Sequence, residues 1–414
     1  MIMTITKKKT LLMALMLAAT SLNVNAKKVI PPFVYHSENT VTGKAPLKWL
    51  NPEQLPVIRR LPNPLAWANG KGEVKNFADW ANRREEISQM IQHYEIGEKP
   101  TVDKSCINPY MIGDTLFVDV TVNTHTIRLK SFIRYPKVGK APYALMIGTS
   151  HLSLPKELFE GRPIATMEFN EAQVNNYSQF GKPAGRGNYA FDKLYPELKD
   201  NGAYSEWAWG LSRLIDGLQM LGAEKTKIDM KHIGLTGCSY AGKMTLFCSA
   251  FDERIALTIA QEPGGGGAAA WRVSQTKDGV ENIDKTDYNW FKQSMKTSFG
   301  GDNVYKLPYD HHELLAMICP RALLVLGNTD YKWLSDESAY VSINAAKKVW
   351  TKFGISDRIG YSIRGGHPHC QLPKEQYPEV EAFIDKFLLD KKDVNTENIE
   401  IAPMFKDKVS LTEW

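Results

Sequence analysis

The chain has 414 residues, of which 43% are hydrophobic and 23% are charged, a composition typical of globular proteins with a large core. Its formal net charge is +5, and three of the positive charges belong to an N-terminal segment that contains no acidic residue. Without that segment the charge is close to neutral, which gives no indication of a nucleic acid partner. No linker-like stretch divides the chain, so we expect one large domain over residues 71–414.

The N-terminus has the pattern of a secretory signal peptide. Three lysines at positions 7–9 precede an apolar run at 11–20, and small residues at 24–26 suit a cleavage site. We therefore predict that residues 1–26 are removed and that the protein is secreted or periplasmic. The apolar run is too short to span a membrane, and no later segment is long enough. No cysteine follows it before Cys106, so the sequence does not indicate a lipid anchor.

Beyond an irregular arm predicted for residues 27–70, which are rich in proline and turn residues, helical and apolar segments alternate. An antiparallel hairpin is predicted first, at 115–122 and 126–135. The predicted strands that follow are 144–147, 164–169, 232–236, 255–260, 322–327 and 359–363, and the predicted helices are 76–94, 204–221, 337–353 and 377–389. This order predicts an α/β protein with a mostly parallel sheet, a leading hairpin and helices on both faces.

The sequence Gly-Cys-Ser-Tyr-Ala-Gly at 237–242 lies between a predicted strand and a helix-like stretch at 243–250. Small residues permit a tight turn there, and Ser239 would project its hydroxyl above the sheet as a nucleophile. The Tyr240 amide and the helix N-terminus would face an oxyanion. The usual pattern of such a turn is Gly-x-Ser-x-Gly, whereas here Ala241 fills the second glycine's place and Gly242 follows it.

Two acids and a histidine loop follow other predicted strands. Glu262 and Asp330 are alternative acids, and His367 and His369 lie in the loop 365–370. The order serine, acid, histidine is that of an α/β-hydrolase, in which histidine takes the serine proton and a carboxylate orients the ring. Taken singly, each residue is more often structural, and Asp330 would then cap a helix. No metal-binding spacing stands out, so we predict neither a metal nor a cofactor, and we expect His311 and His312 to begin a helix.

The five cysteines leave at least one thiol unpaired. Cys238 adjoins Ser239, and Cys370 adjoins His369. If the serine and histidine meet in one site, their neighbours meet too. Two buried free thiols are the alternative, but the paired adjacency favours a Cys238–Cys370 disulfide.

With these motifs in hand, the chain resembles the glucuronoyl esterases, carbohydrate esterase family 15. The resemblance covers most of the chain beyond the signal peptide, and the late glycine of the serine turn fits that family's pattern, Gly-Cys-Ser-Arg-x-Gly-Lys. The segments that carry it are 61–64, 80–100, 237–239, 242–243, 262–267, 271–272, 320–321, 333–334 and 369–370.

The resemblance implies Ser239 as nucleophile, Glu262 as acid and His369 as base, together with the same disulfide. Some bacterial members place the acid after the later strand, which keeps Asp330 as an alternative. The resemblance also implies that Lys243, Trp333 and Glu281 contact a glucuronate sugar. We further expect Trp271, like Trp333, to offer a flat face to a sugar ring.

The expected function is a secreted serine esterase that cleaves esters between the glucuronic acid side chains of xylan and an alcohol, such as those in lignin. It would act on a polysaccharide-linked substrate, and a monomer is favoured. Tyr240 departs from the family pattern, which has an arginine that supplies further donors. The alternatives are an acetylxylan or other carbohydrate esterase, and a catalytically impaired carbohydrate-binding protein on the same fold.

Overall fold

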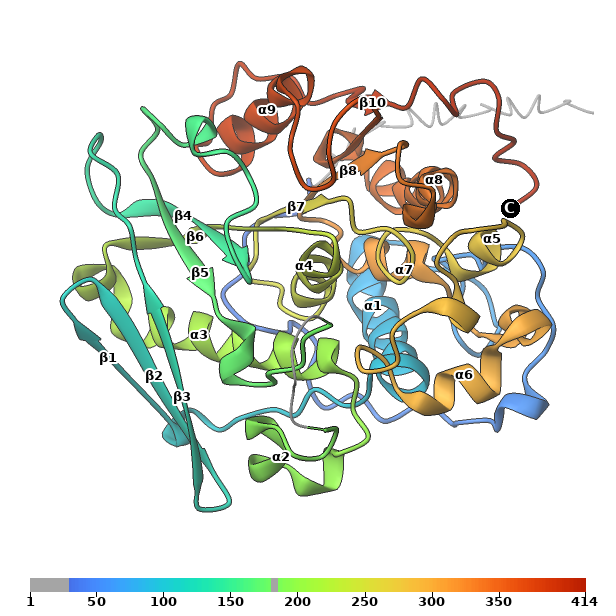
Figure 1. The fold of residues 1–414 in the computed structure, drawn as a ribbon, viewed down its shortest axis with the longest axis horizontal. Coiled ribbons are helices and arrows are strands. Elements are labelled where there is room, and N and C mark those ends of the chain that lie inside the picture. The colour runs from blue at the N-terminus through green and yellow to red at the C-terminus, as the bar shows by residue number, and fades with distance from the viewer. Residues whose placement is uncertain (1–29, 180–184) are drawn as a thin grey trace, which may run out of the picture. The chain divides into compact units, whose positions relative to one another are not determined.

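The computed structural model describes residues 30–179 and 185–414, and residues Pro31–Trp414 form one compact unit (Figure 1). The predicted signal peptide, residues 1–26, lies outside the described residues. Within the described part of the chain, no helix is long and apolar enough to cross a membrane.

The core of the fold is a seven-stranded sheet in the order β10-β9-β8-β7-β6-β4-β5, in which every neighbouring pair is parallel. Its strands are β4 (Tyr143–Thr149), β5 (Ile164–Phe169), β6 (Ile228–Cys238), β7 (Leu257–Gln261), β8 (Ala322–Asn328), β9 (Ile359–Arg364) and β10 (Glu400–Ile401). The predicted parallel sheet is therefore confirmed. The edge strand β10 was not predicted, because two residues carry no readable alternation.

The predicted hairpin is also present, as β2 (Thr115–Val122) and β3 (His125–Phe132). The structure adds β1 (Ile107–Ile112), which pairs with β2, so the hairpin belongs to a separate three-stranded antiparallel sheet. A proline inside β1 hid this strand from the sequence pattern. One bridge between Arg134 and Thr166 joins the segment after β3 to β5 of the main sheet.

Helices cover both faces of the main sheet, as predicted (Figure 1). Along β8, Leu323 and Val325 pack in the larger core with residues of α3, α4 and α8, while Leu324 and Leu326 face the smaller core under α9. Two-sided burial is what a parallel strand requires. The described helices are α1 (Phe77–Ile91), α2 (Ala190–Leu194), α3 (Ala203–Thr226), α4 (Tyr240–Ala250), α5 (Trp271–Gln275), α6 (Gln293–Phe299), α7 (His311–Ala316), α8 (Asp336–Phe353) and α9 (Tyr377–Phe387).

The described part of the predicted arm, residues 30–70, is irregular apart from a short 3-10 turn at Pro52–Gln54 and a bridge at Ala66. Polar anchors hold it to the domain. Glu38 pairs with Lys99 and Arg213, and the Thr40 amide donates to Glu253 at 2.7 Å. α7 begins at His311, which confirms that the two histidines open a helix.

Candidate active site

The predicted nucleophile turn is formed between β6 and α4, with Ser239 as the single residue between them. Its backbone has φ 60° and ψ −125°, outside the usual regions for a residue with a side chain. A Cβ at position 237 would lie 2.0 Å from Thr149 Oγ1, and one at 242 would lie 2.5 Å from the Gln261 carbonyl oxygen. Both glycines are therefore required. The late glycine reflects the close approach of α4's first turn to the end of β7.

Each of three neighbouring strands, β4, β6 and β7, is followed directly by a non-glycine residue with positive φ. These are Ser150 (66°), Ser239 (60°) and Glu262 (47°). Such conformations cost energy and persist where the surroundings enforce them, and they cluster at active sites. Parallel pairing places all three at one edge of the sheet, which is where open α/β sheets carry their sites.

Glu262 and His369 are in direct contact. The distance between Glu262 Oε2 and His369 Nδ1 is 2.5 Å, and the Cys370 amide lies 3.1 Å and 3.2 Å from the two carboxylate oxygens. The carboxylate is almost completely buried, so these donors are what compensates its lost hydration. When Nδ1–H donates to Glu262, His369 Nε2 is left as an acceptor, the form that a general base needs.

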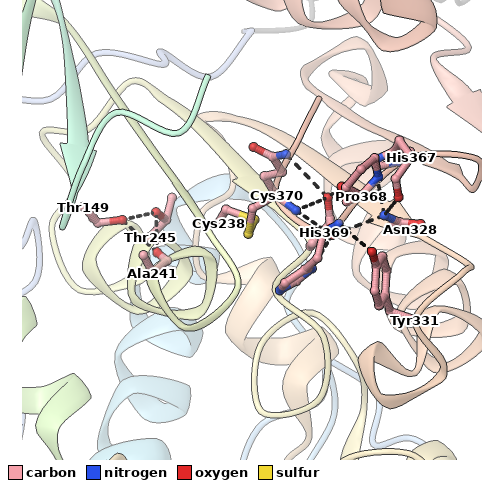
Figure 2. Close-up of a disulfide and its surroundings, with 12 residues drawn as sticks. Thr149, Cys238, Ala241, Thr245, Asn328, Tyr331, His367, Pro368, His369 and Cys370 are labelled. Atoms are coloured by element: carbon pink, nitrogen blue, oxygen red, sulfur yellow. Dashed lines mark hydrogen bonds and ion pairs between the residues drawn. A yellow bond between two sulfur atoms is a disulfide. The ribbon is translucent and has the colours of Figure 1, made fainter. Parts of the chain in front are cut away.

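The predicted disulfide between Cys238 and Cys370 is present, with the two Cα atoms 5.7 Å apart at a sequence separation of 132 (Figure 2). It joins the residue before Ser239 to the residue after His369. The serine turn and the histidine loop are therefore tied together next to the two side chains that are predicted to react. The remaining cysteines, Cys106, Cys248 and Cys319, are free.

The alternative acid, Asp330, supports the histidine loop. Its Oδ2 accepts a hydrogen bond from the Gly366 amide at 2.7 Å. The structure thus pairs the His369 ring with Glu262 and gives Asp330 a backbone partner. Tyr331, which follows Asp330, accepts a hydrogen bond from the His369 amide at 2.9 Å (Figure 2). His367 is buried beside Asn328, whose amide lies 3.2 Å from its Nδ1.

Ser239 opens into a pocket of about 430 Å³. Of the residues predicted to contact a sugar, Lys243, Glu281 and Trp333 line it. Lys243 Nζ lies 2.7 Å from Glu281 Oε2 and 5.2 Å from the centre of the Trp290 ring. Trp333 is 49% exposed, with its ring centre 6.0 Å from that of His369. The pocket therefore combines a cation, a carboxylate and an accessible aromatic face.

The prediction for Trp271 is wrong. Its side chain is fully buried, and its Nε1 donates to Glu95 Oε1 at 3.1 Å. The ring packs at the start of α5 against His311 and Phe291, so it is part of the core and meets no ligand.

Sequence reasoning also missed several residues of the pocket. Trp290, Asp287 and Lys285 line it, but Lys285 ends a 3-10 helix of three residues and the other two lie in irregular chain, so no pattern in the sequence marked them. Sequence reasoning also missed Asn328, at the end of β8. Its amide contacts Glu262 and His367, which lie in two other segments, so its role depends on contacts that a local pattern does not show.

The Tyr240 side chain lies beside the nucleophile and is tied to the neighbouring strand ends. Its hydroxyl lies 2.9 Å from Ser150 Oγ and 3.0 Å from Glu171 Oε1. Burial, with Glu171 adding to it, raises the pKa of Tyr240 to about 12, so the phenol is neutral at ordinary pH. The Tyr240 amide is the first of α4, and amides in a helix's first turn have no carbonyl partner inside the helix.

The site has a serine between β6 and α4, a carboxylate after β7 and a histidine in the loop after β9 of one parallel sheet. This arrangement defines the class: the protein is an α/β-hydrolase.

Comparison with known proteins identifies the family. The fungal glucuronyl esterase family matches residues 118–354. A 4-O-methyl-glucuronoyl methylesterase of Podospora anserina is 37% identical over 368 residues, which cover 87% of this chain and 74% of the relative. The glucuronoyl esterase catalytic domain of Hypocrea jecorina superposes with a TM-score of 0.78 at 33% identity, covering 87% of this chain and 97% of that one. The chain belongs to the glucuronoyl esterase family.

A further solved relative carries a ligand. A mutant glucuronoyl esterase of Sporotrichum thermophile, in complex with methyl 4-O-methyl-β-D-glucopyranuronate, superposes with a TM-score of 0.74 at 33% identity. The match covers 83% of this chain and 91% of that structure.

If the disulfide positions the histidine loop, Cys370→Ser will slow the labelling of Ser239 by a fluorophosphonate, which reacts with activated serines. We expect a decrease of about tenfold or more, because small displacements of catalytic groups cost rate steeply. Labelling is followed by mass spectrometry, with melting temperature as the folding check. Cys106→Ser is the matched control, since Cys106 is a free, half-buried cysteine. Equal labelling of Cys370→Ser and wild type would contradict the role of the disulfide.

Proposed function

We propose that this protein is a serine esterase that hydrolyses esters of glucuronic acid, including those carried by xylan. The observation that carries the proposal is the 2.5 Å contact between Glu262 and His369, tied by the disulfide to the turn that bears Ser239. The names of the relatives, 4-O-methyl-glucuronoyl methylesterases, and the methyl glucuronate ester bound to the Sporotrichum enzyme support the substrate class.

The reaction follows from the placement of these groups. Ser239 Oγ attacks the ester carbonyl carbon while its proton passes to His369 Nε2. Glu262 stabilises the imidazolium that forms, and the Tyr240 amide at the N-terminus of α4 donates to the oxyanion. When the intermediate collapses, His369 gives the proton to the departing alcohol oxygen. Water then attacks the acyl-enzyme with His369 as base, and the proton returns to Ser239 as glucuronate leaves.

The pocket suits a uronate sugar better than an acetyl group. Lys243 donates and Glu281 accepts hydrogen bonds, and a sugar ring presents several hydroxyls to both. Trp333 adds an exposed ring on which a sugar face packs. An acetyl group would leave these polar side chains without ligand partners, which is why acetylxylan esterase activity is the weaker alternative.

Ser239→Ala will abolish hydrolysis of benzyl glucuronate, with kcat falling by at least ~10⁴-fold, because the nucleophile is removed. Release of benzyl alcohol measures it. Ser294→Ala, an exposed serine on α6, is the matched control.

Two results would redirect the assignment. Faster turnover of acetylated xylan than of glucuronate esters would favour the acetylxylan esterase. Binding of glucuronoxylan fragments without turnover of any ester would favour the impaired carbohydrate-binding protein, for which Tyr240 is the motivating observation.

Tyr240→Arg will raise kcat on benzyl glucuronate by about tenfold or more. The resemblance assigns oxyanion donors to an arginine at this position, and one such donor is worth roughly 100- to 1000-fold. Tyr240→Phe is the companion variant, which removes the hydroxyl and adds no donor. An unchanged or lower kcat in a folded Tyr240→Arg protein would show that no missing side-chain donor limits turnover.

We propose that the protein is exported and that residues 1–26 are cleaved. The lysines and the apolar run before residue 26 support this. Mass spectrometry of the exported protein is expected to place its N-terminus near residue 27. Retention of residues 1–26 in that material would contradict the cleavage.

A further inference from the structure

Another cavity, of about 510 Å³, lies between the N-terminal arm, the end of α1, the loop before α3 and the start of α6. We call it the arm groove. Its lining includes Trp49 of the arm, Gln89 of α1, Glu197 before α3 and Lys292 before α6. Among the described residues, none lines both this groove and the pocket of Ser239. The volume is typical of sites for small molecules, which occupy roughly 300–1,000 Å³.

Trp49 forms a rigid aromatic surface in this groove. Its ring stacks on that of His93, with 4.0 Å between the ring centres and 4° between the planes. The arm is tied to α1 and the turn after it on both sides of Trp49. The amide two residues earlier donates to Gln89 Oε1 at 2.9 Å, and the carbonyl of the next residue accepts from the Tyr94 hydroxyl at 3.0 Å. The Trp49 ring is half-buried, so part of a pre-oriented flat surface stays open to a ligand.

The backbone of the groove is fixed as well. α1 continues directly into one π-helical turn, Gln92–Ile96, which carries His93. Such turns are rare and occur frequently at functional sites. After this turn, the Asn201 side chain accepts from the Glu98 amide at 3.0 Å and donates to the Glu98 carbonyl at 2.7 Å. A Cβ at position 97 would lie 2.0 Å from Asn201 Oδ1, so this clamp requires Gly97.

The charges of the groove favour a neutral ligand. Its lining contains three exposed carboxylates, those of Glu98, Glu197 and Asp200. Its two lysines are already engaged. Lys44 Nζ lies 3.4 Å from Glu86 Oε1, and Lys292 Nζ donates to the His93 carbonyl at 2.8 Å. Burial, with Lys292 adding to it, lowers the pKa of His93, so the ring is neutral at ordinary pH. This balance disfavours uronates and phosphates, whereas carboxylates accept hydrogen bonds readily from sugar hydroxyls.

We propose that the arm groove binds a neutral polysaccharide backbone, that of xylan, with a sugar ring packed on Trp49 and hydroxyls bonded to the carboxylates around it. The proposed ester substrate has two chemistries, a neutral backbone and uronate side chains. The Ser239 pocket takes the side chain, and the arm groove takes the backbone. The choice of xylan rests on the proposed function, but binding of a neutral sugar chain needs no reaction at Ser239.

The two sites are close in the chain, since Lys292 of the groove follows two residues after Trp290 of the Ser239 pocket. A polymer held in the groove therefore keeps its uronate side chains at a raised local concentration around that pocket.

The test measures binding of xylohexaose by isothermal titration calorimetry, with Ser239→Ala as the parent protein so that no ester chemistry occurs. In this background, Trp49→Ala is expected to raise the Kd by about tenfold or more, because the flat apolar contact is lost. Trp49→Phe keeps a flat ring and is expected to keep most of the affinity. The Kd is expected to change little between low and high salt, because the ligand carries no charge.

Glu197→Ala is the second variant, since an exposed residue of the loop before α3 can be truncated without disturbing the arm. We expect its Kd to rise by about three- to tenfold, from the loss of one hydrogen-bond acceptor. Trp414→Ala is the matched control, because Trp414 is also half-buried and lies outside the lining of the groove. Its Kd is expected to equal that of the parent, and melting temperatures verify folding in each variant.

The proposal fails if xylohexaose does not bind, or if it binds equally to the parent, Trp49→Ala and Glu197→Ala. Competition by free glucuronate would place xylohexaose in the Ser239 pocket and would also contradict it. Cellohexaose distinguishes the possible sources of a neutral backbone, and tighter binding of cellohexaose would show that xylan is the wrong choice. Sensitive binding in a protein whose wild type hydrolyses no glucuronate ester would refute only the esterase function.

Discussion

The site depends on one buried carboxylate. Glu262 leaves β7 with a left-handed backbone, and its side chain is held by the ring of His369 and the amide of Cys370. One acid thus fixes both the orientation of the His369 ring and the path of the loop that carries it. The disulfide then joins that loop to the nucleophile turn, so three segments far apart in sequence meet over a few ångströms.

This arrangement explains why the histidine loop needs restraints in addition to the disulfide that joins it to the serine turn. A buried carboxylate is tolerated only while its hydrogen-bond donors stay in place, and losing one leaves an uncompensated charge. The hydrogen bond from Gly366 to Asp330 and the one from His369 to Tyr331 hold the same loop from the β8 side. The loop is therefore anchored to the ends of β6, β7 and β8, and the histidine is oriented before any substrate arrives.

Much of this was readable from the sequence, because strand–turn–helix patterns and glycine spacing are local features. The nucleophile turn, the order of the reactive residues and the parallel sheet are of this kind. The choice between Glu262 and Asp330 was not, since both follow buried strands and only the path of the 365–370 loop separates them. Trp271 was misassigned because a tryptophan near a glycine run gives no sign of whether α5 packs inward.

In the proposed mechanism, Tyr240 changes how the oxyanion is stabilised without disturbing this framework. Its hydroxyl is engaged by Ser150 and Glu171, and its pKa of about 12 keeps it neutral. A neutral phenol held there brings no positive charge to the oxyanion, so stabilisation falls to backbone amides and to the N-terminus of α4. In the proposed mechanism, the side chain at position 240 thus acts on transition-state charge, whereas Lys243, Glu281 and Trp333, which line the Ser239 pocket, are the residues proposed to bind the sugar. In the proposed enzyme, substrate recognition and turnover are consequently separable properties, carried by different side chains of the first turn of α4 and the loops around it.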